Sequence, residues 1–204
     1  MATAPHHPPV LTNVTRASEE ARSYEGGSVT VGCVTEIRAG VPEDVMAIAD
    51  INVRSWQVSF RGYFPNEFLD SLNSRDREPF VLDVLTSGPP HHLAVAVEED
   101  QVIGFVMLGP PLDADVDAAS TLELYSLYIE PERIRTGLGR LLMGEALRYL
   151  REGPWTSGVL WAPSAVERTC RFYEAAGWYV DGEKTEEIPA GNPVDHVRYR
   201  IDLE

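Results

Sequence analysis

A basic turn with two glycines is the first candidate for chemistry in this sequence. The letters RTGLGR follow an apolar segment with strand character and precede apolar residues at spacings of three and four, which predict a helix. The first N–H groups of a helix have no internal partner, the helix dipole adds positive charge there, and glycine permits close approach to the backbone. This pattern favours phosphate binding, although an ordinary strand-to-helix turn has the same residues. The candidate residues are Arg135, Thr136, Gly137, Leu138, Gly139 and Arg140.

Glu123 is a second candidate, because it is the only carboxylate in the apolar and aromatic segment LELYSLYI. Burial would raise the pKa of this side chain and make it a better base near neutral pH. A solvated strand end, or an ion pair with an arginine of a helix, would explain the same residue without catalysis. The sequence leaves these alternatives open.

The elements that position these residues are predicted by periodicity and turn signals. We expect strands near 34–38, 93–98, 102–108, 122–129, 157–162, 179–187 and 196–203. We expect two helices between residues 42 and 71, one over 138–152 and one from 163 to 177. Pairing would be antiparallel from residue 93 to 129, and the helix over 138–152 would make strand 157–162 parallel to strand 122–129. This order predicts an α/β (α+β) domain over 34–204, with a mixed, twisted sheet of about seven strands and helices on both faces.

Composition excludes several classes of partner. The formal net charge of −15 argues against nucleic acid and against an anionic membrane surface. The two cysteines, Cys33 and Cys170, form neither a disulfide framework nor a metal-binding spacing, so we expect no metal and a cytoplasmic location. Residues 1–33 lack a sustained period and predict a disordered or loosely packed extension.

The segments EPERIRTGLGRLL and TCRFYEAAGW, in this order after a strand, resemble the GCN5-related N-acetyltransferase (GNAT) family over roughly residues 35–203. The resemblance implies that the glycine turn binds the pyrophosphate of acetyl-coenzyme A (acetyl-CoA). It also implies a V-shaped splay between the fourth and fifth strands, filled by the pantetheine arm. The backbone N–H groups of Leu127 and Ile129 would face this splay, with Leu127 as donor to the oxyanion. Two positions depart from the family pattern, Ile134 before the first glycine and Val166 before Tyr173.

The resemblance also assigns roles to side chains. Glu123 matches the general base of one branch of the family, whereas other members use water chains. Tyr173 matches a tyrosine that protonates the departing thiolate, although an aromatic residue on a helix often belongs to the core. Arg54, Trp56 and Tyr63 would help to bind the acceptor.

The implied activity is acetyl transfer to a primary amine, of a small molecule or a peptide, by direct attack in a ternary complex. A covalent intermediate on Cys170 is the less favoured route, since no base adjoins it in the sequence. Other hypotheses are a non-catalytic acyl-CoA sensor and a scaffold with no small ligand. The resemblance leaves open a homodimer through the final strands.

Overall fold

One mixed sheet of seven strands organises the protein. The computed structural model describes residues 35–187 and 193–204, so the predicted extension over 1–33 lies outside the described residues. The strands are β1 (Glu36–Ala39), β2 (His92–Glu98), β3 (Gln101–Gly109), β4 (Thr121–Ile129), β5 (Ser157–Pro163), β6 (Tyr179–Glu186) and β7 (Val194–Asp202). Their order is β1-β2-β3-β4-β5-β7-β6, so the last strand of the chain lies between β5 and β6. The predicted sheet is confirmed.

Strand directions also agree with the prediction. β1 to β4 are antiparallel neighbours, and β4 and β5 are parallel, connected through α4 (Leu138–Glu152). The β2–β3 turn has positive φ angles at Glu99 and Asp100, 49° and 62°. Two positive φ angles are what a two-residue hairpin connection requires.

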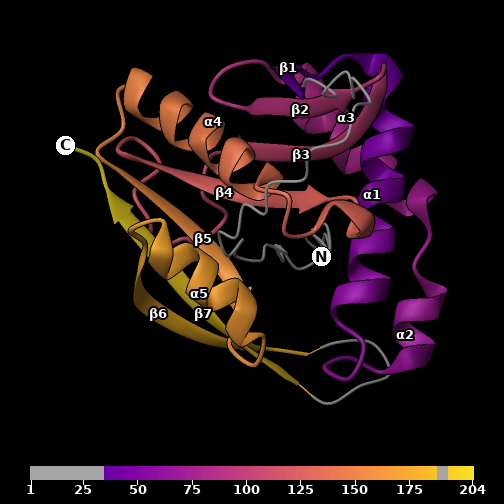
Figure 1. Ribbon diagram of the computed structural model, residues 1–204. Helices are drawn as coiled ribbons and strands as arrows, with labels where there is room; N and C mark the ends of the chain where they lie inside the picture. The colour runs from indigo at the N-terminus through magenta and orange to yellow at the C-terminus, as the bar shows by residue number, and fades with distance from the viewer. Residues whose placement is uncertain (1–34, 188–192) are drawn as a thin grey trace, which may run out of the picture.

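β4 and β5 pair only at their starts. Three residue pairs join them, Thr121–Ser157, Leu122–Gly158 and Glu123–Val159. Beyond these pairs β4 continues to Ile129 and β5 continues to Pro163 without pairing with each other. The other edge of β5 pairs with β7 over the whole strand. Figure 1 shows the two strands spreading apart from a common start. The predicted V-shaped splay between the fourth and fifth strands is therefore confirmed.

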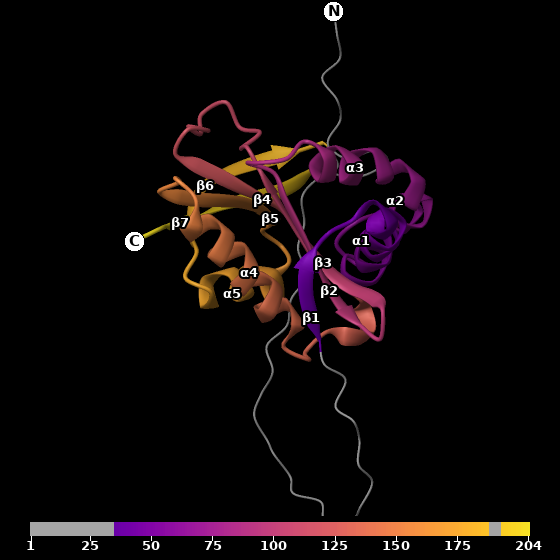
Figure 2. The ribbon, with the colours of Figure 1, turned by 90° about the horizontal axis from the view of Figure 1, so that it is seen from above.

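Helices cover both faces of the sheet (Figure 2). On one side α1 (Val45–Ser59), α2 (Asn66–Ser71) and α3 (Glu78–Thr86) enclose a core that contains Trp56, Phe105 and Tyr128. On the other side α4 and α5 (Glu167–Ala175) enclose a second core, which contains Leu142 and Tyr173. We call the two sides of the sheet the α1 face and the α4 face. No described helix is long and apolar enough to cross a membrane.

Two helix predictions need correction. Three α-helices, not two, precede the first hairpin, because Glu78–Thr86 forms α3. Its Pro79 lies in the first turn, where a missing N–H breaks no helical hydrogen bond. The last helix begins at Glu167 rather than at residue 163, because β5 continues through Pro163 and the backbone of Val166 is not helical (φ −91°, ψ 71°).

Candidate functional site

The splay leaves part of the β4 backbone without a strand partner on one side. Glu130 N–H donates to the Ile103 carbonyl of β3 at 2.9 Å. Because bonding alternates along an antiparallel pair, Leu127 and Ile129 direct their N–H groups away from β3 and toward the splay. Consistently, Ser55 Oγ donates to the Ile129 carbonyl at 2.9 Å from outside the β3–β4 ladder. The side chains of Leu127 and Ile129 are buried, so these residues belong to the core while their backbone faces the splay.

Glu123 lies where β4 and β5 part, and its side chain is buried. Burial raises the pKa of Glu123 to about 7, against the opposing effect of Leu112 N–H, which donates to Oε2 at 2.8 Å. None of the ion pairs among the described residues involves Glu123, and its burial argues against a solvated strand end. A carboxyl group that titrates near pH 7 has the proton affinity that suits a general base.

Tyr173 lies on α5 in the core of the α4 face and is completely buried. Its ring packs against Tyr199 and Trp178, at centroid distances of 5.6 and 6.3 Å. Burial raises the pKa of Tyr173 well above its usual value, so the phenol keeps its proton. Within the described part of the chain its hydroxyl has no hydrogen-bond partner. A buried hydroxyl without a partner costs about 1–3 kcal/mol, a cost that a bound ligand with a polar atom would remove.

The glycine turn has the backbone shape of an anion-binding nest. It follows a short 3₁₀ helix, η3 (Pro131–Arg133), and has positive φ at Arg135 (74°) and at Gly137 (90°). Gly137 is the N-cap of α4, and no side chain caps the helix. The N–H groups of Leu138 and Gly139 therefore have no partner inside the helix or from a capping side chain, whereas Arg140 N–H donates to the Gly137 carbonyl at 3.0 Å.

The side chains of the glycine turn differ in whether they form hydrogen bonds or ion pairs within the protein. Thr136 Oγ1 donates to the Arg133 carbonyl at 2.7 Å, and Arg133 forms an ion pair with Glu98. Arg135 and Arg140 take part in none of the ion pairs found among the described residues. They are the two arginines of the turn that remain available to a phosphate.

A further arginine lies near the turn and was not identified from the sequence. Arg168 belongs to the first turn of α5. Burial lowers the pKa of Arg168, and this arginine also interacts electrostatically with Tyr63 and Arg135. These electrostatic interactions link α5, the α1–α2 connection and the glycine turn, so no spacing in the sequence indicates them. The two departures from the family pattern, Ile134 and Val166, pack against the cores of the α4 and α1 faces respectively.

The three residues predicted to bind the acceptor substrate occupy different environments. Trp56 is buried with Phe60 and Phe64, and its Nε1–H donates to Tyr128 Oη at 2.8 Å. Arg54 forms an ion pair with Glu130, at the end of β4. Tyr63 is 51% exposed and the Arg54 side chain is 53% exposed, so of the three only Trp56 is enclosed in the core.

The α1 face beside Glu123 carries charged residues that the sequence did not place together. Arg198 of β7 bonds to Asp113, Asp115 and Asp181, at 3.3, 2.9 and 2.8 Å. Asp113 also accepts a hydrogen bond from Trp161 Nε1 at 2.7 Å. Arg198 therefore neutralises part of the negative charge of the 110–120 loop.

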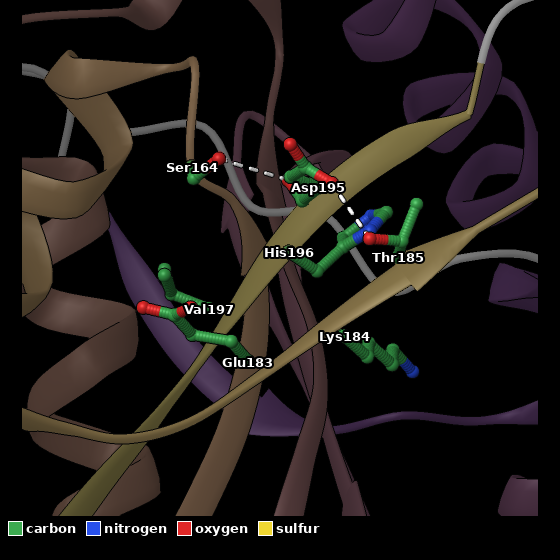
Figure 3. Close-up of a pocket in the computed structure, with 7 residues that line it drawn as sticks. All are labelled: Ser164, Glu183, Lys184, Thr185, Asp195, His196 and Val197. Carbon is green, nitrogen blue, oxygen red and sulfur yellow. Dashed lines mark hydrogen bonds between the residues drawn. The ribbon is translucent and has the colours of Figure 1, made fainter.

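A pocket of about 460 Å³ lies at the end of β5 (Figure 3), where Lys184 and His196 point to one side of the sheet and Glu183 and Val197 to the other. It is lined by Ser164, Glu183, Lys184, Thr185, Asp195, His196 and Val197. In Figure 3 the side chains of Glu183 and Lys184 leave β6 on opposite sides, as alternation along a strand requires.

Comparison with known proteins decides the family. Residues 45–178, more than half of the chain, match the family model described as "Acetyltransferase (GNAT) family". The chain belongs to the GNAT family. The fold and the N-acetyltransferase class that the sequence predicted are thereby confirmed, whereas the roles of individual residues stay predictions.

Several relatives of this GNAT protein are similar over most of its length. It is 30% identical over 144 residues to "Uncharacterized N-acetyltransferase YuaI" of Bacillus subtilis, a match that covers 68% of this chain and 77% of the relative. It is 24% identical over 182 residues to a spermidine N(1)-acetyltransferase of Thermoplasma acidophilum, covering 80% and 97% of the two chains. An N-acetyltransferase structure from the same organism, in complex with coenzyme A, superposes with a TM-score of 0.62 at 18% identity, covering 80% and 98%.

Proposed function

We propose that this GNAT protein transfers the acetyl group of acetyl-CoA to a primary amine by direct attack in a ternary complex. The observation that carries the proposal is the splay of β4 and β5, with a buried carboxyl group, Glu123, on the α1 side and an unpartnered buried hydroxyl, Tyr173, on the α4 side. A gap in the ladder gives two substrates a place to meet within the sheet. Reactants held in this way react as if at very high concentration.

The glycine turn supplies the binding site for the pyrophosphate in this proposal. The backbone N–H groups of Gly137, Leu138 and Gly139 donate to the phosphate oxygens, and the guanidinium groups of Arg135 and Arg140 add positive charge. The Ile129 N–H bonds to the pantetheine arm in the splay. A coenzyme A complex of a protein with the same fold supports this assignment.

The chemical step uses three groups of the chain. Glu123 takes a proton from the amine, whose nitrogen then forms a bond to the acetyl carbon. The Leu127 N–H stabilises the negative charge on the acetyl oxygen. As the carbon–sulfur bond breaks, Tyr173 gives its proton to the sulfur and regains one from solvent. Burial raises the pKa of Cys170, which keeps it a thiol and favours direct attack over an acetyl-cysteine route.

Release of free thiol from acetyl-CoA, measured with a panel of amines, tests this proposal. We expect turnover with at least one amine, and a loss of turnover in Tyr173→Phe while acetyl-CoA still binds. Binding alone can be followed by thermal unfolding, since a ligand at one hundred times its Kd stabilises the folded state by about 2.7 kcal/mol. Stabilisation without turnover on any amine would support a sensor, and no stabilisation would support a scaffold.

A further inference from the structure

Three side chains form a row across the α1 face of the sheet, beginning at the proposed base. Leu112 N–H bonds to Glu123, and the next residue of the loop, Asp113, bonds to Trp161 Nε1 at 2.7 Å. Two consecutive loop residues therefore bridge Glu123 and Trp161. The ammonium group of Lys184 lies 4.2 Å from the centroid of the Trp161 ring. We call Glu123, Trp161 and Lys184 the acceptor row.

Lys184 differs from the other cations near the acceptor row. It is the only lysine among the seventeen Lys and Arg residues of the chain. Arg198 bonds to three aspartates and Arg200 bonds to Asp181, so carboxylates neutralise both arginines. Within the described residues no carboxylate lies in ion-pair contact with Lys184, whose ammonium group lies against the Trp161 ring and interacts at longer range with Glu123.

We propose that the acceptor is a small zwitterion, an amino acid or a close analogue, whose amine faces Glu123 and whose carboxylate is bound by Lys184. This inference rests on the proposed function, because it assigns the acceptor of the same site. The Trp161 ring forms the floor between the two charged groups. The Trp161 ring holds the ammonium group of Lys184 in the acceptor row, because a cation is attracted to the face of an indole ring.

Lys184 shares its side of the sheet with His196 of the pocket at the end of β5, because these two residues pair across β6 and β7 (Figure 3). His196 is 1% exposed, and burial lowers its pKa to about 4, so the ring is neutral at pH 7. Its Nδ1 bonds to the Val194 carbonyl at 3.0 Å. A carbonyl only accepts, so Nδ1 carries the hydrogen and Nε2 is an acceptor, which has no partner among the described residues. His196 thus carries an unused buried acceptor on the side of the sheet that also carries Lys184.

The row disfavours a polyamine as acceptor. Spermidine is the substrate named for one relative of 24% identity. In the present chain a polycation would meet Lys184 beside the base, and the nearest aspartates already bond to Arg198. Like charges at short range are repulsive, so we expect an amine with a carboxylate to react better than one with a second ammonium group.

Matched pairs of acceptors test the proposal by kinetics. The panel contains the twenty protein amino acids, β-alanine and 4-aminobutyrate, each with the amine that lacks its carboxylate, and spermidine. We expect the best acceptor to carry a carboxylate and to exceed its partner amine at least tenfold in kcat/KM. Lys184→Gln should raise the KM for that acceptor about tenfold with less change in kcat, and Lys184→Arg should largely restore it. Arg171→Gln, which removes an equal charge from the exposed side of α5, is the control and should leave the preference unchanged.

Binding gives a readout that does not require turnover. Reductive methylation with ¹³C-formaldehyde labels Lys184 and the chain's terminal amine, and Lys184→Arg assigns the Lys184 resonance by its loss. We expect this resonance to shift saturably with the preferred amino acid, and neither with its decarboxylated partner nor with coenzyme A alone.

The outcomes separate failure of this inference from failure of the proposed function. A saturable carboxylate-dependent shift without any thiol release would keep the site and refute the transferase. Turnover that is fastest with spermidine or another amine lacking a carboxylate would overturn the inference and keep the transferase. An equal shift with coenzyme A alone would assign Lys184 to the cosubstrate and overturn the inference as well.

Discussion

Replacement of Glu123 by glutamine removes the proposed base with little change in shape. Glutamine has nearly the same volume, and its carbonyl oxygen can still accept the hydrogen bond that Leu112 N–H gives to Glu123 at 2.8 Å. The variant therefore isolates the loss of the ionisable group in a buried position. Two quantities should change in opposite directions, the rate of acetyl transfer and the stability of the fold.

The expected change in rate follows from the pKa of about 7 at Glu123. The base form is half populated near pH 7, so kcat/KM of the wild type should rise about tenfold per pH unit below 7 and level off above it. General base catalysis contributes about 10²–10⁴-fold, so Glu123→Gln should lose about this factor above pH 7. The variant should also lose the inflection near pH 7.

The expected change in stability has the opposite sign. The folded state holds the proton of Glu123 more tightly than the unfolded chain, since burial raises the pKa from 4.5 to about 7. This group therefore lowers the free energy of unfolding as pH rises from 4.5 to 7 and has a constant effect above 7. At 1.36 kcal/mol per pKa unit the loss is about 3 kcal/mol. Glu123→Gln lacks this loss, so it should be more stable than the wild type at pH 8 and gain less at pH 5.

Two assays test these expectations on the same preparations. Thiol release from pH 5.5 to 9 gives the rate profile, and urea unfolding at pH 5 and 8 gives the stability difference. Glu145→Gln is the control, because Glu145 of α4 bonds to His92 and Arg148, outside the proposed site. An unchanged rate profile in Glu123→Gln would refute the assignment of Glu123 as base and would favour a water chain.

Three further substitutions give separate predictions. Tyr173→Phe removes the proposed acid, so kcat should fall at least tenfold, and an unchanged kcat would contradict the acid role. Because the lost hydroxyl has no partner among the described residues, urea unfolding should show unchanged or slightly higher stability. Gly137→Ala places a side chain at φ 90°, with no atom within 4 Å of its Cβ, so the variant tests backbone strain without a steric clash. The strain should cost about 1–2 kcal/mol in urea unfolding and raise the KM for acetyl-CoA. Wild-type values of both quantities would show that the turn relaxes freely. Gly104→Ala brings a Cβ to 3.0 Å from Leu142 and from the Tyr128 carbonyl, so thermal unfolding should show a loss of about 1–3 kcal/mol, and full stability would indicate that α4 can shift.

The fold was largely predictable from local pattern, and the residues of β4 and α4 show why. Alternation, helical spacing and the glycine turn all lie within one continuous stretch, and the bounds of α4 were predicted without error. α3 was missed because a proline in its first turn interrupts the apolar pattern. Both errors in the helices involve proline, because Pro79 lies inside the first turn of α3 whereas Pro163 ends β5 and lies outside α5.

The site was predictable only where it lies in one segment. Glu123 stands out as an acid in an apolar strand, and its burial follows from that strand. Lys184 and Trp161 come together because β7 lies between β5 and β6, an order that no local spacing determines. Arg54 likewise pairs with Glu130, seventy-six residues away, a contact that no local spacing indicates.

A crystal structure with coenzyme A tests the central claim most directly, that the β4–β5 splay and the glycine turn together bind acetyl-CoA. The account predicts the pyrophosphate on the N–H groups from Gly137 to Gly139, the pantetheine arm between β4 and β5, and the sulfur within hydrogen-bond distance of Tyr173 Oη. Coenzyme A bound outside the splay, or a splay closed by side chains with the ligand present in the crystal, would contradict it.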